Sequence, residues 1–206
     1  MDTQLELWQV VLSVGAPFIL AVVEIFHPHP HDLLRIDLPA WLFVHYAQLL
    51  LFPLSALGLA TLMRGQTGIA PMLCRICMFL FGVAYTIFDT AAGLVTGILI
   101  KAANLSSNPE AWRPAIDTVW THPIVGGAPA PFLAVFGSVA LSVGAVAAAV
   151  KFKRSGSSWI PVLLLVMSSF GIAVFKTHAW PGGPLTFGGI AIASAWLLWE
   201  KRTAAA

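Results

Sequence analysis

Three histidines alternate with two prolines in the segment EIFHPHPHD, residues 24–32, which has an acidic residue at each end. Neutral imidazole is the commonest protein ligand for metal ions, and a nearby carboxylate can bind the same ion or orient the imidazole. Glu24 and His27 share a face of any helix that reaches His27, whereas Pro28 and Pro30 favour an extended chain in which the three imidazoles cannot all face one ion. We therefore expect His27 to face inward, with looser roles for the other two histidines.

The remaining three histidines, His45, His122 and His178, come from three other parts of the chain. Zinc takes three or four nitrogen or oxygen ligands, and copper also accepts imidazole readily. No metalloprotease signature of the form H-E-x-x-H is present, so the prediction depends on convergence in space rather than on spacing. We predict a zinc or copper site whose ligands are His27, His45, His122 and His178.

A b-type haem is a second possible use of these imidazoles. It needs two axial histidines at similar depth on facing helices, and His45 and His178 would be the pair. Both are expected very near the membrane boundary, so we rank haem behind a metal ion.

Asp89 is the other residue that could do chemistry, because it interrupts the apolar stretch YTIFDTAAGLVTG. An ionisable residue within a membrane span is energetically costly and is by default a candidate functional residue. Gly93 and Gly97 form a small-xxx-small pattern at i+4 and i+8 from Asp89, which is typical of a close helix–helix contact. Asp89 is therefore expected to point into a helical bundle.

The composition indicates a membrane protein of a single domain. Of 206 residues, 58% are hydrophobic and 10% are charged, whereas soluble domains have about 25% charged residues. Each of six apolar stretches approaches the roughly 20 residues of a spanning helix, so we predict an all-α bundle of about six transmembrane helices. The predicted spans are 7–26, 40–63, 71–100, 129–151, 158–178 and 184–200, with an outer loop at 101–128 that could hold a short interfacial helix.

Basic residues predict the orientation of this bundle. The side that holds the N-terminus carries Arg64, Arg75, Lys151, Lys153, Arg154, Lys201 and Arg202, and the other side carries Arg35, Lys101, Arg113 and Lys176. The positive-inside rule therefore places both termini in the cytoplasm, in a multi-pass protein of a cytoplasmic (inner) membrane. Residues 1–7 contain no Lys or Arg, and no small-residue cleavage site follows, so we expect the first span to be retained.

This topology brings all six histidines to the outer face. Estimated at about 1.5 Å per helical residue, Gln48, Asp89 and Ser169 would lie at matching depths beneath a rim of imidazoles and carboxylates. We expect a polar funnel whose substrate-binding residues are Gln48, Tyr85, Ser169 and Lys176.

The first functional hypothesis is a metal-dependent membrane enzyme that acts on a lipid or small amphiphile, with Glu24 or Asp89 moving the proton. The second is a transporter or binding protein for a metal ion or small solute, with Asp89 as the intramembrane site. The third is a structural membrane subunit.

The net charge of +2 and the absence of a Lys/Arg run exclude nucleic acid as an expected partner. Cys74 and Cys77 form a CxxC pattern without the βαβ context of redox proteins, so we expect packing residues. The sequence makes no prediction of the oligomeric state.

Overall fold

The structure is a computed structural model of the chain, and it describes residues 7–128 and 130–203. These residues form helices and connecting segments, with no β-strand among them. The first long helix consists of α1 (Leu7–Val10), a π-turn η1 (Val11–Gly15) and α2 (Ala16–Ile25). It ends just before the two prolines of the histidine segment, as expected for residues that disfavour helix.

The second and third helices form the centre of the bundle. A short 3-10 turn, η2 (Leu33–Arg35), leads to α3 (Leu38–Thr61), whose N-cap Asp37 accepts a hydrogen bond from the backbone N–H of Ala40. The third helix is continuous over Ile69–Leu105, through α4 (Ile69–Asp89), a π-turn η3 (Thr90–Val95) and α5 (Thr96–Leu105). Its 37 residues correspond to about 55 Å, which exceeds the roughly 30 Å hydrocarbon core of a bilayer.

The second half of the chain begins with two short elements, η4 (Pro109–Trp112) and α6 (Arg113–Trp120), in the predicted interfacial segment. Helix α7 (Phe132–Arg154) follows, then α8 (Trp159–Ser169), the short α9 (Gly171–Phe175) and α10 (Gly182–Thr203).

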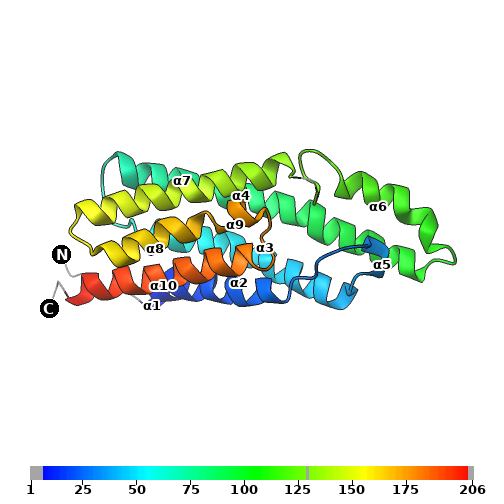
Figure 1. The fold of residues 1–206 in the computed structure, drawn as a ribbon, viewed down its shortest axis with the longest axis horizontal. Helices are drawn as coiled ribbons and strands as arrows, with labels where there is room; N and C mark the ends of the chain where they lie inside the picture. Colours follow the sequence, from blue (N-terminus) through cyan, green and yellow to red (C-terminus); the bar gives the residue numbers. More distant parts are fainter. Residues whose placement is uncertain (1–6, 129, 204–206) are drawn as a thin grey trace.

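Six helices form a closed ring around one hydrophobic core. Helix α2 packs on α3, α3 on α4, α4 on α7, α7 on α8, α8 on α10, and α10 returns to pack on α2. Figure 1 shows these helices running along the long axis of the molecule, with the α5–α6 hairpin extending beyond the others at one end. The core includes Cys74 and Cys77, which are buried free thiols on α4, in agreement with their predicted packing role.

The predicted spans agree closely with the observed helices, with one difference in the fifth. Five helices are long and apolar enough to cross a membrane, whereas the predicted span 158–178 is a shorter apolar segment, Trp159–Phe175. This segment breaks at Phe170, between α8 and α9. The freed backbone groups find side-chain partners, because the Ser142 hydroxyl donates to the Ser169 carbonyl oxygen and the Ile172 N–H donates to Thr186.

The α5–α6 hairpin has a small hydrophobic core of its own. Leu33, Ile100, Ala103 and Ile116 form a buried cluster between η2, α5 and α6. This cluster ties the histidine segment to the hairpin, so the hairpin and the segment form a cap at the end of the bundle opposite α1 (Figure 1).

Candidate metal centre

Glu24, His27 and His178 each offer a ligand atom, and these three atoms lie within 4.8 Å of one another. Glu24 comes from the last turn of α2, His27 from the segment that follows it, and His178 from the connection between α9 and α10. Gly183 allows this approach, since a Cβ there would lie 1.7 Å from the His178 carbonyl oxygen and 2.9 Å from Cγ of Glu24. The group is thus built from segments that are far apart in the sequence.

The hydrogen bond of His27 determines which ring nitrogen is available. Nδ1 lies 2.8 Å from the carbonyl oxygen of Pro28, and because a carbonyl only accepts, Nδ1 carries the proton. Nε2 then has a free lone pair, and it is buried without a hydrogen-bond partner among the described residues. Burial, and then the neighbouring His178 and His45 imidazoles, hold the pKa of His27 well below the usual value for histidine. A neutral imidazole with one N–H on a backbone carbonyl is the arrangement in which histidine binds a metal ion.

Gln48 connects the other two members of the group. Its side-chain N–H group donates to Oε1 of Glu24 at 2.9 Å and lies 3.2 Å from Nδ1 of His178. Nδ1 of His178 also lies 3.3 Å from Oε2 of Glu24. Gln48 is fully buried on α3, so it contacts both side chains from inside the bundle. Through these contacts Gln48 positions the side chains of Glu24 and His178, and its predicted role in substrate binding stays a prediction.

His45 lies beside the group rather than within it. Its ring centroid is 4.9 Å from that of His27, and its Nδ1 donates to the carbonyl oxygen of Trp41 at 2.7 Å. Nε2 lies 3.7 Å from Oδ1 of Asp89. Gly93 makes room for this ring, because a Cβ there would lie 1.7 Å from Cδ2 of His45.

Asp89 points into the bundle, as the glycine pattern predicted, and its side chain is 1% exposed. Neither carboxylate oxygen has a hydrogen-bond partner among residues 7–128 and 130–203. The π-turn η3 begins at the next residue, and π-turns inside helices are frequent at functional sites. Asp89 is thus a buried carboxylate beneath the histidines with unused hydrogen-bonding capacity.

The other predicted residues are divided between this region and the rest of the molecule. Tyr85 hydrogen bonds to Ser138 at 2.7 Å, with its ring centroid 6.3 Å from that of His178. The Ser169 hydroxyl donates to the Val166 carbonyl oxygen within its own helix. His122 is exposed, and its Nδ1 accepts from the backbone N–H groups of Ile124 and Val125, so the structure does not bring it to the other histidines. His29 and His31 are also exposed.

A cavity of about 440 Å³ adjoins the group. His27 and His178 line its wall, together with Tyr85, Trp120 and Lys176. Glu24 is not among the lining residues, so it lies behind the two imidazoles. The rest of the wall is mainly apolar. It comes from α7 and α9, from Phe88 on α4, from the segment before α7, and from residues 28–30 of the histidine segment, which include His29.

Charged residues of the cap hold the histidine segment over this cavity. Arg113 on α6 forms ion pairs with Asp32 at 3.2 Å and with Glu110 at 2.7 Å. The hydrogen bonds from Arg113 lower the pKa of both carboxyl groups. Trp120 packs on Trp41 with a centroid distance of 5.9 Å. The ion pairs therefore hold the cap together, and the Trp120–Trp41 contact joins it to the bundle.

Trp41 and Ser138 are residues of this region that the sequence analysis missed. Trp41 packs against His45 at 4.3 Å and its indole N–H donates to the Gly93 carbonyl oxygen at 2.8 Å. Its position four residues before His45 places it on the same helix face, and this spacing was a usable signal. Ser138 had no such signal, since its role depends on the approach of α7 to α4.

Comparison of the chain with protein-family models, with curated proteins and with solved structures finds no match. The functional argument therefore depends on the geometry of these residues.

Proposed function

We propose that this chain is a metal-dependent enzyme of the cytoplasmic membrane that acts on a lipid or another amphiphile. The observation that carries the proposal is the convergence of Glu24, His27 and His178, with the lone pair of His27 Nε2 free. Two imidazoles and a carboxylate are a donor set of catalytic zinc sites, in which the fourth position is left for water or substrate. Copper binds the same donors, so zinc and copper are both candidate ions.

The cavity supports a catalytic role over a structural one. His27 and His178 line it while Glu24 lies behind them, so a substrate can approach the ion from one side only. A bound zinc ion lowers the pKa of its water and so supplies a hydroxide at neutral pH. If Glu24 is a ligand, Asp89 is the buried carboxylate that remains to move a proton, with His45 beside it. The apolar walls favour an amphiphilic substrate.

The surface of the bundle supports the membrane setting. Large apolar side chains on the outside of the helices are highly exposed, including Ile69 at 80% and Met167 at 72%. Exposure of this kind is stable in hydrocarbon and not in water. The excess of basic residues in the segments at the other end supports a cap and a candidate centre that lie outside the cytoplasm.

Metal analysis of the purified protein tests this proposal. The protein is purified in detergent, with a histidine-free tag and no added metal, and its metal content is measured by mass spectrometry. We expect close to one zinc or copper ion per chain, lost in His27→Ala and in His178→Ala. His31→Ala and His122→Ala are matched controls that should keep the ion, because both side chains are exposed and neither lines the cavity.

An enzyme also requires turnover. Incubation of the metal-loaded protein with a membrane lipid extract should give a metal-dependent loss of one lipid class, followed by mass spectrometry. The proposal would be contradicted if the wild-type protein contained no metal and if its thermal stability equalled that of His27→Ala and His178→Ala. One metal ion per chain without any turnover would support the metal site and contradict the proposed enzymatic activity.

A carrier for a metal ion is the second candidate, and the unpartnered carboxylate of Asp89 favours it. A buried carboxylate without partners can hold a cation within the membrane. Uptake of zinc into proteoliposomes that is abolished by Asp89→Asn would support the carrier. The b-type haem has less support, since His27 packs against both His45 and His178 at centroid distances of 4.9 and 4.8 Å.

A further inference from the structure

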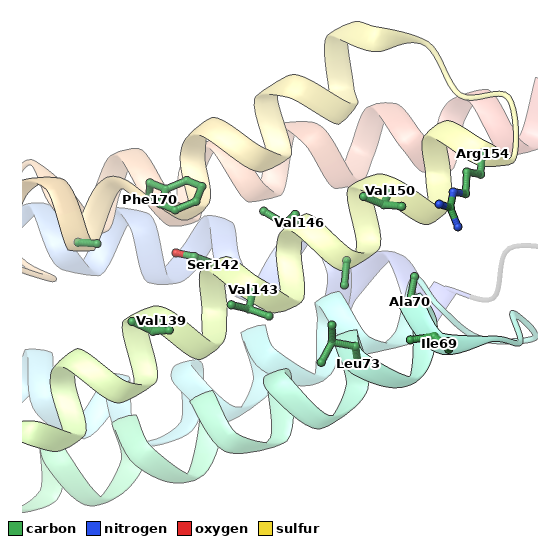
Figure 2. A pocket seen from close by; sticks show the side chains of 12 residues that line it. Ile69, Ala70, Leu73, Val139, Ser142, Val143, Val146, Val150, Arg154 and Phe170 are labelled. Carbon is green, nitrogen blue, oxygen red and sulfur yellow. The ribbon is translucent and has the colours of Figure 1, made fainter.

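A second apolar cavity, of about 570 Å³, lies along one face of α7. Figure 2 shows Val139, Val143, Val146 and Val150 spaced along this face. The first turns of α4 form one wall, through Ile69, Ala70 and Leu73, and Phe170 and Ala173 form another. We call this cavity the α7 groove.

The α7 groove adjoins the cavity at the candidate metal centre. Val139 and Ala173 line both of them. A molecule whose polar group lies beside His27 and His178 can therefore extend past Val139 along α7 without leaving the protein surface. The two cavities together form one path with polar groups at its upper end.

The chemistry of this path changes from polar to apolar along its length. The end at the candidate metal centre, called the upper end below, carries the two imidazoles and Lys176, whose side chain is exposed at the cavity. Below Val139 the lining residues are apolar except Ser142 and Arg154. The Ser142 hydroxyl already donates to the Ser169 carbonyl oxygen at 2.8 Å, so it offers no free donor to a ligand. Arg154 lies at the far end, in the last turn of α7.

The length of the α7 groove fits a hydrocarbon chain. Val139 and Arg154 are fifteen residues apart, which corresponds to about 22 Å along a helix. One leaflet of a bilayer is about 15 Å of hydrocarbon, half of the roughly 30 Å core. The groove is therefore longer than a leaflet and can accept the full length of a long chain.

We infer that the α7 groove binds the hydrocarbon chain of the substrate, a lipid with one long chain and an anionic polar head. The head lies at His27, His178 and Lys176, and the chain passes between Val139 and Ala173. This inference rests on the proposed function, because the polar head has a reason to stop at the upper end only where an ion is bound. It adds the substrate class.

A photoactivatable palmitic acid with a diazirine in the middle of its chain tests the inference. The protein is reconstituted in phosphatidylcholine nanodiscs, labelled by light, and the labelled peptides are mapped by mass spectrometry with and without excess unlabelled palmitic acid. We expect saturable labelling within residues 139–150 that falls several-fold with the competitor. The exposed side chains of Phe43, Tyr46 and Leu50 on α3, which line neither cavity, are the internal reference and should show weaker labelling that the competitor does not change.

Two groove variants and one control make the test specific. Val139→Trp blocks the junction of the two cavities, and Val143→Trp fills the groove below it, so both should lower the saturable labelling several-fold. Val22→Trp is the matched control on α2, because Val22 is 39% exposed against 40% for Val143 and lines neither cavity. The metal content of all three variants should equal that of the wild-type protein.

The outcomes separate this inference from the proposed function. Labelling along α7 that is no stronger than along α3, or that the competitor does not reduce, means that bulk lipid fills the groove and overturns the inference while the metal site stands. Saturable labelling unchanged in both tryptophan variants also overturns it. A protein without metal overturns the proposed function, whatever the labelling shows.

Discussion

Nε2 of His45 lies 3.7 Å from Oδ1 of Asp89, and both side chains are buried in the bundle. Because Nδ1 of His45 donates to the Trp41 carbonyl oxygen, Nε2 of the neutral imidazole can only accept. An ionised Asp89 would then set two groups of lone pairs against each other. A proton shared by the two residues would remove this repulsion.

Substitution of Asp89 separates its shape from its charge. Asp89→Asn keeps the shape and supplies an N–H donor for Nε2 of His45, so we expect a Tm close to that of the wild-type protein. Asp89→Ala leaves Nε2 of His45 buried without a donor, and we expect the free energy of unfolding to fall by about 1–3 kcal/mol. Thermal unfolding in detergent measures both. A large loss of stability in Asp89→Asn would show that the ionised carboxylate is itself structural.

Gln48→Leu removes the amide that holds Glu24 and His178. Substitution of a residue that orients metal ligands typically lowers metal affinity by about 10–100-fold, and we expect a loss of this size. Competition with a chelator of known affinity measures it. Ser55→Ala is the control, because Ser55 is buried on the same helix and should leave the affinity unchanged. An unchanged affinity in Gln48→Leu would contradict the positioning role of Gln48.

Gly93→Ala places a methyl group where the His45 ring lies, at 1.7 Å from Cδ2. The ring or the helix must move, and overpacking of this kind costs about 1–3 kcal/mol of stability. Gly15→Ala is the control, since a Cβ at Gly15 meets no atom within 4 Å. The Tm values of the two variants should differ in the stated direction, with Gly93→Ala lower. Equal Tm values would mean that α3 and η3 are not in close contact at this point.

The cap should loosen in acid. The pKa values of Asp32 and Glu110 are lowered by Arg113 from ordinary values of 3.8 and 4.5, so each carboxylate favours the folded cap above its ordinary pKa. This contribution is lost as the pH falls through the lowered values, and it is constant above about pH 5. The protection factors of residues 30–36 and 110–120 against hydrogen exchange, each corrected for the intrinsic rate at that pH, should therefore fall below pH 4 in the wild-type protein. Arg113→Ala should show the faster exchange already at pH 7, and Lys101→Ala should behave as the wild-type protein does. Equal exchange at pH 7 in Arg113→Ala would contradict this account.

The helices could be predicted from sequence because hydrophobicity over about 20 residues depends only on the local chain. The predicted span 40–63 is observed as Leu38–Thr61, and 129–151 as Phe132–Arg154. The break at Phe170 could not be predicted, because the hydroxyls of Ser142 and Thr186 that satisfy the freed backbone groups come from other helices.

The inward role of Asp89 and the pairing of Glu24 with His27 also follow from the sequence. A carboxylate within an apolar helix is too costly to face lipid, and Pro28 and Pro30 keep the chain from continuing the helix, which ends at Ile25. Both arguments concern residues that are close together in the chain, and they need no knowledge of the neighbouring helices.

Only the tertiary structure decided which histidines meet. His178 joins Glu24 and His27, His45 lies beside them against Asp89, and His122 turns to its own backbone. Topology placed all of these residues at one end of the bundle, but the order of the helices around the ring determines which of them come within a few ångströms. That order depends on the packing of side chains between helices, which no local pattern in the sequence contains.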